Sequence, residues 1–104
     1  MKTGEHSERG RYVTEQVALW IANEGDATFY KGTNDRIAFI AARHAWDGEL
    51  DALARFATHL IRTAQPAHAA WQVQQELAPN DYDRIRWEDV AAELKATFDK
   101  EGLN

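Results

Sequence analysis

The sequence contains no cysteine and a single serine among its 104 residues. Without cysteine the chain forms no disulfide, offers no thiolate nucleophile and has no cysteine-ligated zinc site. The one serine, Ser7, lies in a polar N-terminal stretch without periodicity. The chain therefore has no cysteine or serine on a predicted helix beside a base that would activate it. We expect a protein that is not an enzyme.

A long apolar segment is also missing, and basic residues are outnumbered. The N-terminal sequence MKTGEHSERGR is polar and has no run that would serve as a signal peptide or a membrane span. We therefore expect a cytoplasmic protein with no membrane partner.

The 12 lysines and arginines stand against 17 acidic residues, which gives a formal net charge of −5. This sign opposes binding to phosphate backbones, so nucleic acid is the less favoured partner.

Apolar residues recur at helical spacing through most of the chain. Val13, Val17, Trp20 and Ile21 follow the pattern i, i+4, i+7, i+8, which predicts one buried stripe of a helix that begins near Arg11. Four further segments show this period, at about 35–45, 47–64, 66–77 and 87–98. The residues predicted to point inward in them are Ile37, Ile40, Ala41, His44, Leu50, Leu53, Ala57, Leu60, Ile61, Ala64, Ala70, Val73, Leu77, Trp87, Val90, Ala91, Leu94 and Phe98.

The chain shows no alternating β-branched runs and no hairpin dipeptide between strand patterns, so the sequence predicts an all-α protein. The expected architecture is a single compact domain of about five short helices over residues 11–104. Residues 1–10 are expected to form a flexible leader. Trp20 and Trp87 have the spacing of core residues, and we expect both to be buried.

The turns between the predicted helices carry further expectations. The break at residues 23–26 ends the first helix, and Gly25 is expected to adopt a positive φ there. This turn would let Phe29 and Tyr30 cover the end of the core. The residues predicted to cap or start the later helices are Asn34 or Asp35, Asp47 and Pro66.

No arrangement for metal or cofactor chemistry is found. The histidines at positions 6, 44, 59 and 68 include no i, i+4 pair and no HExxH motif. Asp47, Glu49 and Asp51 match the first, third and fifth positions of a calcium loop, but Ala52 and Thr58 stand where that loop needs glycine and glutamate. The glycines form no GxxxxGK phosphate loop. We expect no metal and no cofactor.

Two terminal motifs carry a resemblance to a known group of proteins. These are Tyr12-x-Thr14-x-x-Val17-x-Leu19-Trp20-Ile21-x-Asn23-Glu24 and Trp87-Glu88-Asp89-Val90-Ala91. They resemble an uncharacterised family of small helical proteins encoded by phages and plasmids. The resemblance implies a mobile-element setting, in which small acidic proteins commonly act by occupying a host protein, as anti-restriction and anti-CRISPR inhibitors do. It implies no activity and no site residue.

The leading functional hypothesis is a non-enzymatic module that binds a host protein or protein complex. Acidic residues outnumber basic ones from Glu76 to the C-terminus, so a negative face near the last helix is expected. Such a face would imitate a phosphate backbone towards a partner with a basic groove. The contact residues that we expect are Asp47, Glu49, Asp51, Glu88, Asp89 and Glu93.

The alternative hypothesis is a small nucleic-acid-binding regulator. Its contact residues would be Arg36, Arg43, Arg55 and Arg62, which fall two to a predicted helix at seven-residue spacing and would form one arginine-lined edge. The same arginines are more typical of a solvent edge on which they pair with nearby acids, and this interpretation is favoured.

Overall fold

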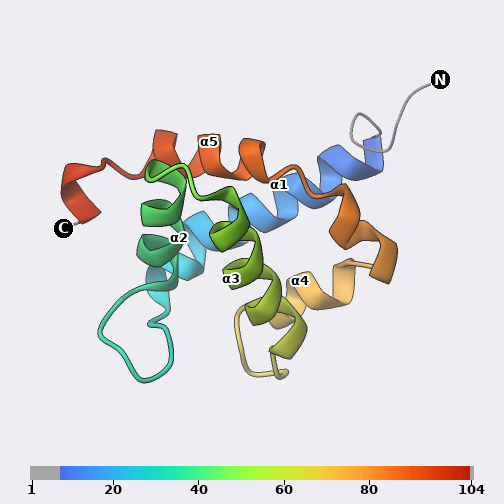
Figure 1. Cartoon of the computed structure of the whole chain (residues 1–104). Coiled ribbons are helices and arrows are strands. Elements are labelled where there is room, and N and C mark those ends of the chain that lie inside the picture. Colours follow the sequence, from blue (N-terminus) through green and yellow to red (C-terminus); the bar gives the residue numbers. More distant parts are fainter. Residues whose placement is uncertain (1–7, 104) are drawn as a thin grey trace.

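A computed structural model describes residues 8–103 of the chain (Figure 1). Five α-helices form in this range: α1 (Glu8–Asn23), α2 (Ile37–Trp46), α3 (Leu50–Thr63), α4 (Trp71–Glu76) and α5 (Trp87–Thr97). Short 3-10 turns follow α1, precede α5 and close the described chain: η2 (Gly25–Ala27), η3 (Pro79–Arg84) and η4 (Glu101–Leu103). The only strand-like pairing in residues 8–103 is one antiparallel bridge between Phe29 and Arg36. The predicted all-α domain is confirmed.

The helices pack around α1 and α5. In Figure 1, α5 crosses the top of the molecule, where it packs against α1, α2 and α3. The opposite side of α1 contacts the short helix α4. The turn η3 packs beside the N-terminal half of α1. A groove lies between α1 and α4.

The longest predicted stripes are the ones that the structure buries. Val13, Val17, Trp20 and Ile21 of α1 are all at most 5% exposed. The predicted inward residues that are also buried in the later helices are Leu53, Ala57, Leu60, Ile61, Ala64, Ala70, Val73, Leu77, Val90, Ala91 and Leu94. At the ends of these stripes, Leu50 is exposed, and Trp87 and Phe98 are only partly buried. The prediction of two buried tryptophans therefore holds for Trp20 alone, since Trp87 at the start of α5 packs against the core but is only partly buried.

The buried face of α2 differs from the prediction. Its core residues are Ile37 and four alanines, at 38, 41, 42 and 45, whereas Ile40 and His44 are partly exposed. Because alanine is small, this face lets α2 approach α1 and α5 closely. Spacing alone favoured the larger Ile40 over its alanine neighbours, which is why the predicted face was rotated from the observed one.

The predicted helix starts are wrong at several positions. Asp47 follows α2 as its C-cap, and Glu49 precedes α3 without a side-chain cap. Gly48 makes the intervening turn with a φ of 74°. Arg36, rather than Asn34 or Asp35, precedes α2, and Asp35 forms an ion pair with Arg43. Pro66 lies in a turn, and α4 begins only at Trp71.

Part of the predicted leader is helical. Residues 1–7 lie outside the described residues, but residues 8–10 belong to α1, and Gly10 is buried. The first turn is fixed by Arg9, which bonds to η3, and by the Gly10 carbonyl, which accepts a 2.7 Å hydrogen bond from Thr14 Oγ1. The helical domain therefore starts at Glu8 at the latest.

The break after α1 is structural, but for a different reason than predicted. Gly25 is buried at the start of η2 and is not among the glycines with a positive φ. A Cβ atom on Gly25 would lie 3.3 Å from the backbone nitrogen of Ala38. Close approach to the first turn of α2 therefore selects glycine. Tyr30 packs against Phe56 with ring centroids 5.4 Å apart, whereas Phe29 is 58% exposed and does not cover the core as expected.

We expect Gly25→Ala to lower the free energy of unfolding by about 1 kcal/mol, because the added methyl group must displace the backbone of α2. Urea unfolding followed by far-ultraviolet circular dichroism measures the change. Gly102→Ala is the matched control, since a Cβ there would meet nothing within 4 Å. Equal stability of the Gly25→Ala variant and the parent would contradict close packing at this position.

Candidate functional site

The predicted protein-binding residues lie on adjoining elements. Asp47, Glu49 and Asp51 occupy the turn between α2 and α3 and the first turn of α3, and both helices pack against α5. Glu88, Asp89 and Glu93 lie on α5. All six side chains are exposed, and we call them together the acidic surface. The structure thus places the two predicted groups on neighbouring helices along the top of Figure 1.

Three residues of the acidic surface have no ion-pair partner among the described residues. Glu49 lies 3.8 Å from His44, while Glu88 and Asp89 lie 3.8 Å and 3.4 Å from Arg86. Asp47, Asp51 and Glu93 have no ion pair within residues 8–103. Asp47, Asp51 and Glu93 are therefore the unpaired carboxylates of this surface.

The four arginines of the alternative hypothesis do not form one edge. Arg43 pairs with Asp35 and donates a hydrogen bond to the carbonyl of Leu103 in η4. Arg62 instead stacks 4.5 Å over the ring of Tyr82 in η3. Figure 1 shows η4 (red) and η3 (orange) at opposite sides of the molecule. The prediction of a single arginine-lined edge is therefore wrong.

Arg36 is also engaged within the fold. Its guanidinium lies 3.6 Å from Asp26 and 5.4 Å from the centroid of the Phe39 ring. Arg55 is exposed on α3. Three of the four arginines thus have intramolecular partners, as expected of arginines at a solvent edge.

A buried carboxylate, missed by sequence reasoning, joins the start of α1 to η3. Asp81 in η3 has a side chain that is 2% exposed, and it accepts hydrogen bonds from Arg9 at 2.6 Å and from Arg84 at 3.0 Å. The backbone N–H of Ala78 donates a third bond at 2.8 Å. The hydrogen bond from Arg9, above all, lowers the pKa of Asp81 to about 2. Its oxygens are saturated by the fold, so this cluster is structural.

The sequence did contain a signal for this carboxylate. Pro79 and Asp81 occupy the first and third positions of η3, where proline and an acid that reaches back to the preceding N–H are typical of a helix start. The helix predicted at about 66–77 ends just before this segment, so the segment is easily taken for a helix end. Recognising it as a start would have identified Asp81 as a capping residue.

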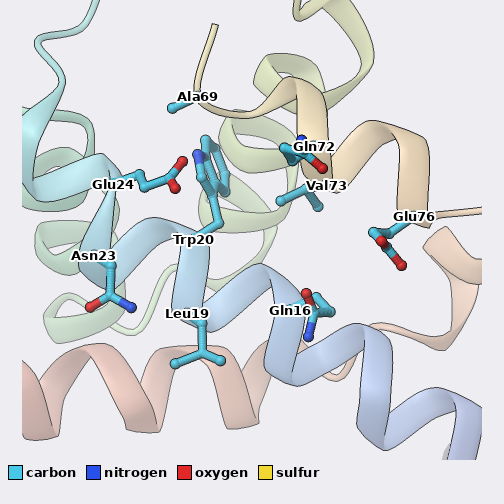
Figure 2. Close-up of a pocket in the computed structure, with 9 residues that line it drawn as sticks. All are labelled: Gln16, Leu19, Trp20, Asn23, Glu24, Ala69, Gln72, Val73 and Glu76. Atoms are coloured by element: carbon cyan, nitrogen blue, oxygen red, sulfur yellow. The ribbon is translucent and has the colours of Figure 1, made fainter.

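A groove with about 220 Å³ of space runs between α1 and α4 (Figure 2). The groove exists because two rows of side chains with helical spacing face each other. The spacing is i, i+3, i+4, i+7 and i+8 in the first row and i, i+3, i+4 and i+7 in the second. The first row is Gln16, Leu19, Trp20, Asn23 and Glu24, and the second is Ala69, Gln72, Val73 and Glu76. The break at residues 23–26 thus brings Glu24 to one end of the groove.

The groove offers hydrogen-bonding groups that the fold does not use. Trp20 is 5% exposed, and its buried Nε1 has no acceptor among the described residues. Figure 2 shows the indole standing between the helices, with Glu24 beside it and Gln72 and Val73 across the groove. At the other end, Glu76 accepts a 2.8 Å hydrogen bond from the hydroxyl of Tyr12, which raises the pKa of Tyr12.

A second hollow of about 760 Å³ opens between the loop at residues 30–31, the end of α3 and the segment that follows it. Its titratable side chains are those of Tyr30, Lys31, His59 and His68. His68 has a structural use, because its Nδ1 accepts a 3.0 Å hydrogen bond from the N–H of Ala70. The walls bring together no carboxylate that would orient either histidine as a base.

Residues 8–103 contain no group of three or more histidine, aspartate or glutamate side chains placed to hold a metal ion. Ser7 lies outside the described residues. Among the described helices, none is both long and apolar enough to cross a membrane.

Comparison with known proteins gives no relative. A scan against known protein families, a search of curated proteins and a search of solved structures each found no match to this chain.

Proposed function

We propose that this protein is a non-enzymatic binding module that engages a host protein in the cytoplasm through its acidic surface. One observation carries the proposal: Asp47, Asp51 and Glu93 are exposed on elements that pack together and have no ion pair within residues 8–103. Unpaired carboxylates of this kind favour a basic partner, because complementary charges attract before contact. The narrower proposal, that the partner belongs to a restriction or CRISPR system, rests only on the resemblance of the terminal motifs.

The proposal is tested by reversing the three unpaired charges. We expect the triple variant Asp47→Lys, Asp51→Lys and Glu93→Lys to associate at least about ten-fold more slowly with its partner at low salt, because electrostatic attraction acts mainly on the rate of association. The partner is first captured from a lysate of the host and identified, and association is then measured by surface plasmon resonance at several salt concentrations. Interference with restriction and CRISPR activity in cells tests the narrower proposal.

A control variant separates the acidic surface from net charge. Glu15→Lys, Asp83→Lys and Glu101→Lys replace three exposed acids on other elements and give the same net charge. The control should associate at nearly the parental rate. An equal loss in both variants would contradict a specific role of the acidic surface. Tight binding of duplex or single-stranded nucleic acid without any captured protein would overturn the proposal in favour of nucleic-acid binding.

A further inference from the structure

We propose that the groove between α1 and α4 binds an arginine or lysine side chain on an extended segment of a partner protein. The inference rests on the proposed function only in that the partner is a protein. The residues that line the groove are separate from those of the acidic surface. Charge, hydrogen bonding and size each point to this occupant.

The charge of the groove selects a cation. Its lining contains two carboxylates, Glu24 and Glu76, and no basic residue. Glu24 has no ion pair within residues 8–103. The nearest arginine described at the Glu76 end, Arg9, donates to the Glu76 carbonyl but is held by Asp81. An incoming cation therefore finds its uncompensated partner at the Glu24 end.

The hydrogen-bonding groups of the groove suit a peptide backbone. The buried Nε1 of Trp20 needs a hydrogen-bond acceptor. Glu24 lies beside the indole, and when its carboxylate turns towards the cation, a backbone carbonyl of the bound peptide supplies this acceptor. The amides of Gln16, Asn23 and Gln72 also have no hydrogen-bond partner among the described residues. An extended chain presents alternating donors and acceptors that such amides can bond.

The space within the groove suits one side chain of a longer segment. Its volume of about 220 Å³ is below the roughly 300–1,000 Å³ of pockets that enclose small molecules and cofactors. One long side chain fits such a space. The lining of α1 spans eight residue steps, from Gln16 to Glu24, which is about 12 Å of helix and matches about four residues of extended peptide.

The test uses nuclear magnetic resonance on the full chain. The indole N–H signal of Trp20 is assigned from its loss in Trp20→Phe. The probe is the peptide acetyl-Ala-Arg-Ala-Lys-Ala-amide, titrated to millimolar concentration, and the matched peptide has glutamate at both basic positions. We expect the basic peptide to shift the Trp20 signal in a saturable manner and the acidic peptide to leave it unchanged.

Two variants identify the contact. Glu24→Gln should weaken binding of the basic peptide roughly three-fold or more, as loss of a partly exposed ion pair would. Glu15→Gln removes an exposed carboxylate from α1 outside the groove and should leave the affinity unchanged.

Three results would overturn the inference: no shift of the Trp20 signal with the basic peptide, an equal response to the acidic peptide, or equal effects of the two variants. The outcome is distinguishable from that of the proposed function. If a captured partner is weakened by reversal of the acidic surface but binds Glu24→Gln normally, the groove is not its site and the proposed function stands. If Glu24→Gln weakens the partner and reversal of the acidic surface does not, the groove is supported and the acidic surface is not.

Discussion

Replacing Asp81 by asparagine should lower the free energy of unfolding by about 2–4 kcal/mol. The carboxylate accepts bonds from Arg9, Arg84 and the N–H of Ala78, so all of its neighbours are donors. An asparagine of the same size would have to direct its own NH₂ donor at one of these three donors. The two arginine side chains are 45% and 37% exposed and stay hydrated, which keeps the loss below that of a fully buried ion pair.

Asp83→Asn is the control for this substitution. Asp83 lies two residues further along the same 3-10 turn, and its side chain is exposed. Urea unfolding of both variants, followed by circular dichroism, should show a large loss for Asp81→Asn and almost none for Asp83→Asn. Similar stabilities for the two variants would mean that Asp81 does not join α1 to η3 in solution.

The same carboxylate predicts how the stability difference depends on pH. In the folded chain the pKa of Asp81 is about 2, below its ordinary value of 3.8. Because the folded state favours the ionised form, its contribution is fully present above about pH 4 and is lost as the pH falls towards about 2. The stability gap between the parent and Asp81→Asn should therefore narrow over this range. A gap that is constant from neutral pH to about pH 2 would contradict the ionic origin of the effect.

The sequence predicted the long helices well because their periodic stripes are long. Val13, Val17, Trp20 and Ile21 extend over more than two turns of α1, so burial of one face overrides local alternatives. Helix starts were predicted poorly, since Asp47 and Pro66 are as common in turns as at caps. Tertiary contacts, which single-sequence patterns do not contain, decide between these uses.

The groove could not be predicted from the sequence. Gln16, Asn23 and Glu24 lie beside the apolar stripe of α1, and polar residues there look the same whether they face water or another helix. Only the packing of α4 against α1 turns that edge into a groove wall. The acidic surface was accessible to sequence reasoning because exposed acids need no partner helix to be recognised.

Replacing Trp20 by alanine should lower the free energy of unfolding by about 3–5 kcal/mol, because the loss of a buried indole leaves a cavity between α1 and α4. Trp87→Ala is the matched comparison. Since Trp87 is only partly buried at the start of α5, its loss should cost about 1–2 kcal/mol. Equal losses, measured by urea unfolding, would contradict the different burial of the two tryptophans.

Trp20→Phe separates the packing of this residue from its N–H group. Phenylalanine keeps most of the apolar ring but removes a buried donor that has no acceptor among the described residues, and such a donor costs about 1–3 kcal/mol when unpaired. The loss of volume and the removal of the unpaired donor oppose each other, so the variant should unfold within about 1 kcal/mol of the parent. A loss as large as that of Trp20→Ala would show that Nε1 is already bonded in the free protein. Near-parental stability together with weakened binding of the basic peptide would show that the fold tolerates an unpaired N–H in the groove because the ligand supplies its acceptor.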